Sequence, residues 1–185
     1  MAKKTVILKW NPAISSYGMI RFLSDICREE SCSDWSIWEH EKVRCGDDCY
    51  MLKVGLGACG IVAKGRITSD PELDNDWREP DRKVFYCDYE MMFMVNPETL
   101  PILTAEELEK TIPDFDWRGG HAGVVLPQPQ AGILQELFDR YLETHAEKFI
   151  ERLERLEKRG WLNDQLYLET RLRASLEKRL PPPRA

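Results

Sequence analysis

The sequence has no long apolar run. Of its 185 residues, 43% are hydrophobic and 31% are charged, and none of its apolar stretches approaches the roughly 18 residues that a membrane-spanning helix needs. Before Lys9 the sequence has two lysines and only a short apolar run, which is not the pattern of a secretory signal peptide. We therefore expect a globular protein of the cytoplasm.

An excess of positive charge is also missing. The formal net charge is −6; residues 131–185 hold 11 Lys/Arg and 10 Asp/Glu, which leaves 15 basic and 22 acidic residues in 1–130. Binding nucleic acid by bulk neutralisation of phosphates requires clustered lysine and arginine. A nucleic-acid role for the first 130 residues would thus need a local basic rim or a pocket that recognises a single base.

Signatures of catalysis are absent as well. The three histidines are scattered, and no hydrolase, metalloprotease, nucleotide-binding or deaminase motif occurs. The letters "GLGACG" at 55–60 match a dinucleotide motif, but a strand pattern follows, whereas a phosphate site needs the N-terminus of a helix. We expect neither an enzyme nor a cofactor.

The cysteines allow two interpretations. Cys27, Cys32, Cys45 and Cys49 could supply four thiolates to a tetrahedral zinc, although their spacing is loose for such a site. Alternatively they are small buried residues, since Cys27 falls in a helical apolar stripe and Cys59 in a strand. In the absence of a secretory signal we expect reduced thiols, and we favour the second interpretation, with no metal.

The apolar pattern predicts two parts, a mainly β domain at 1–130 and a helical hairpin at 131–185. Residues 70–83 are polar and are predicted to be a long connection. Ser15 or Ser16 is a plausible N-cap of the first helix, and Thr104 with Glu107 has the spacing of a capping box. Strands are expected within 5–9, 34–43, 45–55, 60–68 and 84–95, and helices within 17–30, 97–113, 131–160 and 161–180.

Tryptophans dominate the candidate functional residues. Five of them, Trp10, Trp35, Trp38, Trp77 and Trp117, lie in or beside predicted loops of the first domain. Each could be a partly buried core residue, because a tryptophan buries well if its N–H finds a partner. Their number beside glycine-rich strands instead favours an aromatic-walled pocket that stacks a flat ligand. The amide of the residue after Trp10 could then recognise a ring edge.

The order of these features resembles the EVE-like branch of the PUA superfamily, and is most similar to the modified-base sensor domains of modified-DNA restriction systems. The resemblance covers residues 5 to about 140. Its matching residues are Trp10-Asn11-Pro12, Gly46-Asp47, Leu52, Gly60-Ile61, Gly65, Ile67, Ser69, Pro71, Trp77, Asp88, Phe93, Trp117 and Gly123. The chain departs from the sensor pattern at Cys59, where an arginine is common, and at Ala122, where a serine is common.

The resemblance implies an α+β fold, a twisted and partly closed β-barrel with covering helices. It also implies non-catalytic binding of a modified base, commonly a methylated or hydroxymethylated cytosine, flipped out of DNA or RNA. The residues it would place around the pocket are Trp10, Asn11, Trp38, Gly65, Ser69, Trp77, Asp88, Trp117 and Gly123.

The C-terminal helices support an alternative function. Their mixed charge and apolar stripes are typical of a cap packed on the barrel, or of a surface that binds a second copy or another protein through residues 131–180. The second possibility predicts an exposed apolar stripe along Leu134–Leu156 and no aromatic pocket.

Overall fold

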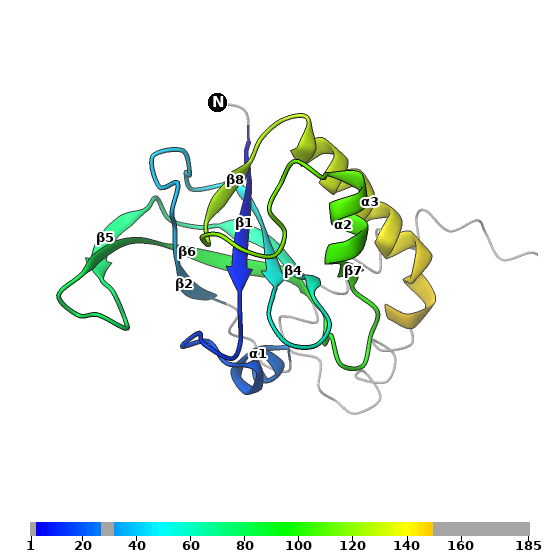
Figure 1. The fold of residues 1–185 in the computed structure, drawn as a ribbon, viewed down its shortest axis with the longest axis horizontal. Coiled ribbons are helices and arrows are strands. Elements are labelled where there is room, and N and C mark those ends of the chain that lie inside the picture. Colours follow the sequence, from blue (N-terminus) through cyan, green and yellow to red (C-terminus); the bar gives the residue numbers. More distant parts are fainter. Residues whose placement is uncertain (1–2, 27–31, 150–185) are drawn as a thin grey trace, which may run out of the picture.

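The computed structural model describes residues 3–26 and 32–149, and these form an α+β fold around one mixed sheet of eight strands (Figure 1). The sheet order is β2-β6-β4-β3-β1-β8, with β5 paired to β6 and β7 paired to β4. The strands are β1 (Thr5–Trp10), β2 (Cys32–Ser36), β3 (Asp48–Lys53), β4 (Gly60–Ile67), β5 (Glu72–Asn75), β6 (Lys83–Met94), β7 (Leu103–Thr104) and β8 (Val124–Leu126). The helices are α1 (Met19–Asp25), α2 (Ala105–Thr111) and α3 (Gln130–Thr144).

Strand β1 lies in the middle of the core. It pairs in parallel with β3 and antiparallel with β8, and its residues Val6, Ile7 and Leu8 are fully buried. A continuous apolar run is what a strand covered on both faces requires. A parallel pair needs a long crossover connection, and the chain between β1 and β3 supplies it through α1 and β2.

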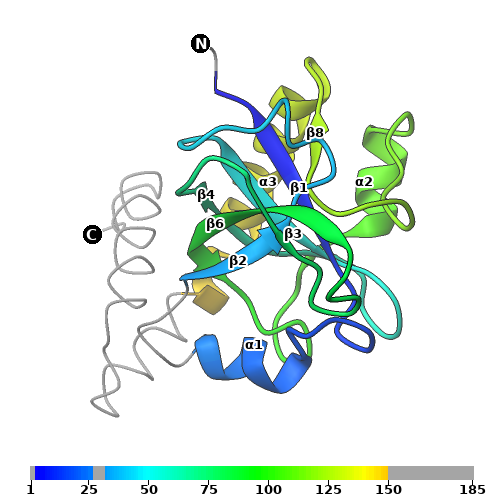
Figure 2. The same cartoon turned by 90° about the vertical axis from the view of Figure 1, so that its left-hand side faces the viewer.

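Strand β6 curls the sheet. Its twelve residues pair with β4 and also with β2 and β5. Register shifts interrupt the pairing between Lys64 and Gly65 and between Met51 and Leu52, and such bulges bend a strand and increase its twist. Figure 2 shows the resulting curled sheet, with α1 below it and α3 behind it. The partly closed α+β architecture predicted from the sequence is confirmed for the described residues.

Two glycines of β4 permit close approach of neighbouring backbone. A Cβ atom built on Gly65 would lie 2.1 Å from the carbonyl oxygen of Glu90, and one built on Gly60 would lie 2.2 Å from that of Leu103. Real Cβ atoms do not come so close to a carbonyl oxygen. These glycines are therefore explained by strand packing rather than by approach of a ligand.

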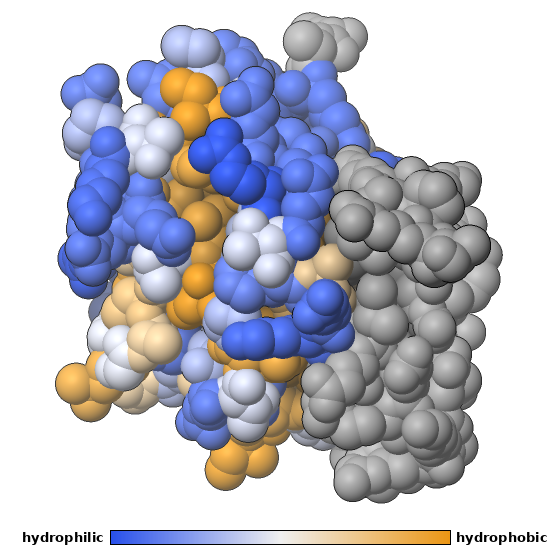
Figure 3. Space-filling view, turned by 90° about the vertical axis from the view of Figure 1, so that its right-hand side faces the viewer, coloured by the Kyte–Doolittle hydropathy of each residue, from blue (hydrophilic) through white to orange (hydrophobic). Residues whose placement is uncertain are grey.

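Helix α3 packs its apolar face into the same core as the sheet. The buried side chains are those of Ala131, Leu134, Phe138, Tyr141 and Leu142. Figure 3 shows the side of the molecule that carries α2 and α3, where a central strip of apolar atoms lies between hydrophilic side chains and further apolar atoms lie at the lower left and bottom edges. The exposed apolar stripe predicted to begin at Leu134 is thus wrong for its described part.

The rest of the predicted tail lies outside the described residues. The second helix predicted at 161–180 lies wholly among those residues, and the surface predicted to dimerise, 131–180, lies there in part. Both stay predictions, as does the domain boundary at 130. No helix in ranges 3–26 and 32–149 is long and apolar enough to cross a membrane.

The short sequence patterns that predict helix caps and strands were not all correct. The capping box of α2 is confirmed. The Thr104 hydroxyl accepts from the Glu107 backbone N–H, and the Glu107 carboxylate accepts from the Thr104 backbone N–H. A serine cap of α1 is wrong: Gly18 precedes the helix without a side-chain bond, and the Ser15 hydroxyl accepts instead from the Tyr17 N–H. Strand β5 was missed within the predicted connection because all four of its residues are exposed and show no alternation.

The Gly65→Ala variant should be less stable than wild type by about 1–3 kcal/mol, because the added methyl group must displace backbone of β6. Chemical denaturation measures the difference in free energy of unfolding. Gly132→Ala on α3 is the matched control, since its Cβ would meet only the flexible Gln128 side chain at 3.6 Å. It should leave stability unchanged or raise it by up to about 1 kcal/mol, and equal losses in both variants would contradict the close-approach argument.

Candidate functional site

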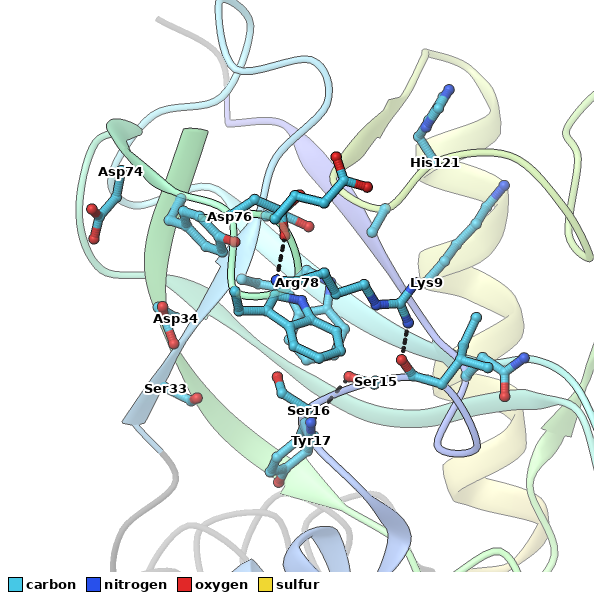
Figure 4. Close-up of a pocket in the computed structure, with 18 of the residues that line it drawn as sticks. Lys9, Ser15, Ser16, Tyr17, Ser33, Asp34, Asp74, Asp76, Arg78 and His121 are labelled. Carbon is cyan, nitrogen blue, oxygen red and sulfur yellow. Dashed lines mark hydrogen bonds between the residues drawn. The ribbon is translucent and has the colours of Figure 1, made fainter. Parts of the chain in front are cut away.

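A cavity of about 650 Å³ opens between three segments that are far apart in the sequence. They are the β1–α1 loop (residues 11–18), strand β2 and the β5–β6 loop (residues 76–82) (Figure 4). Its volume falls within the range of about 300–1,000 Å³ that small-molecule sites occupy. The cavity is the candidate functional site.

Aromatic side chains form much of its wall. Trp35 is only 8% exposed and stands edge-on to Tyr17 and to Tyr89, with ring centroids 6.1 Å away in both cases. Its indole N–H has no hydrogen-bond partner in the described part of the chain. Trp77, from the β5–β6 loop, is 51% exposed. The lining therefore combines a buried ring, that of Trp35, with a ring that is half in solvent, that of Trp77.

Arg78 reaches across the cavity. Its guanidinium lies 4.6 Å from the centroid of the Trp77 ring and donates a hydrogen bond to the carbonyl oxygen of Ile14 (Figure 4). The carboxylate of Asp76 accepts from the Arg78 backbone N–H at 2.8 Å and pairs with Arg82 at 3.6 Å. These contacts fix the β5–β6 loop and tie it to the β1–α1 loop.

Negative charge gathers on one side of the cavity. Asp34, Asp74 and Asp76, here named the acidic wall, all line it together with Tyr86. Burial, together with the charges of these three aspartates, raises the pKa of the Tyr86 hydroxyl. In Figure 4 Asp34 and Asp74 lie on the side opposite Lys9 and His121, with Arg78 between.

Lys9 and Arg118 form the cationic side. The Lys9 ammonium donates to the carbonyl oxygen of Gly119, which places it next to Arg118. Burial lowers the pKa of Lys9, and the nearby carboxylate of Asp116 opposes this shift. Arg118 binds Glu109 through two hydrogen bonds of 2.6 and 3.0 Å. Lys9 and Arg118 are thus placed with the carboxylates of Asp116 and Glu109 beside them.

Trp10 and Trp117 do not line the cavity. Trp10 is fully buried, packs 4.6 Å from Phe22 between ring centroids, and donates its indole N–H to the Tyr17 carbonyl at 2.6 Å. Trp117 is 1% exposed and donates to the carbonyl of Ile112 at 2.9 Å. Both rings are core residues, so the expectation that they wall the pocket is corrected: neither presents a free face to a ligand.

Asn11 and Trp77, two of the residues that the sequence resemblance would place around a pocket, line the cavity. The Asn11 side-chain oxygen accepts from the Ala13 N–H at 3.1 Å. It lies only 2.8 Å from the position that a Cβ atom on Gly55 would occupy. Its amide therefore also shapes the loops around it. Trp38 is outside the lining but stacks on His121, which belongs to it, with centroids 3.6 Å apart and planes 7° from parallel.

The remaining predicted residues lie elsewhere. The Ser69 hydroxyl accepts from the Asp88 backbone N–H at 2.8 Å, which joins the β4–β5 connection to β6 away from the cavity. Gly65 serves the close approach to β6. Gly123 has φ +67° and leaves no space for a Cβ, which would lie 2.5 Å from the Cα of Ile37. The structure thus gives these positions packing and backbone roles and does not bring them to the cavity.

Sequence reasoning did not select Trp35, Tyr86 or Arg78 as site residues. Trp35 was among the tryptophans noted beside loops, and the alternation within "SDWSIW" carries a signal, since buried Trp35 and Ile37 are two residues apart. For Arg78 the signal is its position next to Trp77. Nothing local in the sequence shows that the loop bearing both residues folds back to meet Ile14.

Thiols provide no metal centre among the described residues, in which no group of three or more His, Cys, Asp or Glu side chains could hold a metal ion. Cys49 and Cys87 are free and buried, and burial raises the pKa of both thiols. Cys27 lies outside the described residues, so the four-cysteine zinc alternative stays a prediction.

The fold is similar to that of solved structures, although no protein-family model and no curated protein matches the sequence. Human THYN1 in complex with 5-methylcytosine-containing DNA matches with a TM-score of 0.52 and 11% identity, over 73% of this chain and 97% of that chain. A hypothetical protein from Leishmania major matches with a TM-score of 0.50 and 12% identity, over 76% and 98%. At such identities the likeness shows that the fold is shared and nothing more.

Alanine substitutions at Trp10 and Trp77 should distinguish a tryptophan of the core from one that lines the cavity. Trp10→Ala should lower the free energy of unfolding by about 3–5 kcal/mol, because it removes a fully buried ring. Trp77→Ala should change it by less than about 1 kcal/mol, because half of that ring is already in water. Denaturant titration of both variants measures this. A Trp77→Ala loss as large as that of Trp10→Ala would contradict the assignment of Trp77 to the cavity wall.

Proposed function

We propose that this chain is a non-catalytic binding module whose cavity takes up one base of DNA or RNA. The observation that carries the proposal is the cavity itself, whose lining includes Trp35, Trp77 and Asn11. A second support is the shared fold with THYN1, a protein solved in complex with 5-methylcytosine-containing DNA.

Trp77 would supply the stacking surface. Its ring already carries a flat partner, the Arg78 guanidinium, at 4.6 Å. A base that takes the place of this guanidinium keeps a flat stack on the ring, and stacking of a base on an aromatic side chain is worth about 1–3 kcal/mol. That gain offsets the few kcal/mol needed to unstack a base from its neighbours.

Cations around the cavity would meet the phosphates. Arg78, once released from Ile14, and the cationic side, Lys9 and Arg118, are placed to contact the backbone of the bound nucleotide. Because residues 1–130 carry a net charge of −7, we expect few phosphate contacts and a correspondingly weak dependence of affinity on salt. Recognition then depends on the base more than on the backbone.

The base we propose is a modified cytosine, such as 5-methylcytosine. The support is the THYN1 complex together with the sequence resemblance to modified-base sensors. A methyl group adds apolar area that an aromatic wall of the kind formed by Trp35 and Tyr17 removes from water.

The Trp77→Ala variant should bind a short single-stranded oligonucleotide with one 5-methylcytosine about 5- to 150-fold more weakly than wild type, the equivalent of about 1–3 kcal/mol of stacking. Fluorescence anisotropy of the labelled oligonucleotide measures the dissociation constants. Leu73→Ala is the matched control, because Leu73 is exposed to a similar extent (56%) on the adjacent strand but does not line the cavity.

Three results would count against the proposal: no binding of any oligonucleotide by wild type, equal loss in both variants, or no loss in Trp77→Ala. An equal affinity for cytosine and 5-methylcytosine would reject the modified base while leaving base binding intact.

A further inference from the structure

We infer that the cavity selects a base that carries an exocyclic amino group, and rejects its oxo counterpart, through the carboxylate of Asp34. The inference rests on the proposed function and concerns which edge of the base the site reads.

Asp34 has a carboxylate that the fold does not use. Its side chain lines the cavity and makes no hydrogen bond or ion pair within the described part of the chain. In the pairing of β2 with β6 it lies directly opposite Asp88, and like charges directly opposite each other in a sheet are destabilising. Asp34 is exposed, so water satisfies its carboxylate in the free protein, and the same carboxylate is open to a ligand with donor groups.

The other members of the acidic wall are already engaged. Asp74 accepts from the Asn75 backbone N–H at 2.7 Å. Asp76 holds Arg78 and Arg82 in the β5–β6 loop. They add negative potential on this side of the cavity, while Asp34 retains its acceptor sites for a ligand. An ionised carboxylate can only accept hydrogen bonds, so its partner on the base must be an N–H group.

Trp35, the next residue of β2, independently indicates a polar ligand. Its side chain is 8% exposed, lines the cavity, and has an indole N–H with no partner in the described residues. Buried polar groups are nearly always hydrogen-bonded. Because successive side chains of a strand point to opposite faces, this unpartnered donor lies on the buried face of β2 and the exposed carboxylate of Asp34 on the other, while both residues line the cavity.

Charge on the two sides orients the nucleotide. Lys9 and Arg118 lie on the cationic side and attract the phosphate, while the acidic wall repels it. The base edge is thereby turned toward Asp34. An amino group there donates to the carboxylate, whereas an oxo group places two acceptors against each other.

Thymine and 5-methylcytosine make a sharp comparison, because both have the methyl group and they differ at the 4-position, oxo in one and amino in the other. Wild type should bind a short single-stranded oligonucleotide with one 5-methylcytosine at least about tenfold more tightly than the same oligonucleotide with thymine at that position. Fluorescence anisotropy gives both dissociation constants, and their ratio is the readout.

Asp34→Asn should bring this ratio close to one, because an amide both donates and accepts. The variant should fold, since the side chain of Asp34 has no partner to lose. Glu136→Gln on α3 removes the same charge from an exposed residue that does not line the cavity, and it should keep the wild-type ratio. Taking a ratio cancels any general gain in nucleic-acid affinity that follows from the loss of one negative charge.

The outcomes distinguish the two proposals. Wild type that binds both oligonucleotides equally, or an Asp34→Asn variant that keeps the full preference, overturns the inference but leaves base binding in place. Wild type that binds neither oligonucleotide overturns both.

Discussion

One buried hydrogen bond sets the geometry on which the candidate site depends. The indole N–H of Trp10, at the end of β1, donates to the carbonyl of Tyr17 at 2.6 Å inside the core. Because a buried donor without a partner costs about 1–3 kcal/mol, this bond holds the chain in a compact turn between the two residues. That turn is the β1–α1 loop, which supplies Asn11, Ile14 and the Tyr17 side of the cavity. Trp10 thus shapes the cavity without touching a ligand.

The curl of the sheet supplies the opposite wall. Close approach of β4 to β6 at Gly65 lets β6 extend beyond β4 and pair with β2 and β5. The β5–β6 loop then reaches back to the β1–α1 loop, where Arg78 meets Ile14. Segments more than 60 residues apart in the chain come together with carboxylates on one side and cations on the other. Such local charges make the proposed binding of a single nucleotide compatible with the net negative charge of residues 1–130, because a bound ligand meets the local field rather than the net charge.

The apolar pattern of the sequence made most of the fold predictable. The site was less predictable, because it is formed by contacts between segments far apart in the chain. Apolar runs marked β1, β3, β4 and β6, and the letters of the capping box located α2. Strand β5 carried no signal, since its four residues are all exposed. Five tryptophans in or beside predicted loops could not be told apart from the sequence. In the structure, the indole N–H groups of Trp10 and Trp117 donate to the buried carbonyls of Tyr17 and Ile112. Trp77 remains half exposed. Which tryptophan finds a partner is decided by tertiary structure, and local sequence does not encode it.

The proposed entry of a base into the cavity between Trp35 and Trp77 can be tested most directly through the indole N–H resonances of the protein. The chain has six tryptophans, and the ¹⁵N-labelled protein can be titrated with a short single-stranded oligonucleotide containing one 5-methylcytosine, with signals assigned from Trp→Phe variants. The account predicts that the resonances of Trp35 and Trp77 shift with added oligonucleotide, while those of Trp10 and Trp117, whose N–H groups are bound to backbone carbonyls, keep their positions. Unchanged Trp35 and Trp77 resonances at saturating oligonucleotide would contradict it.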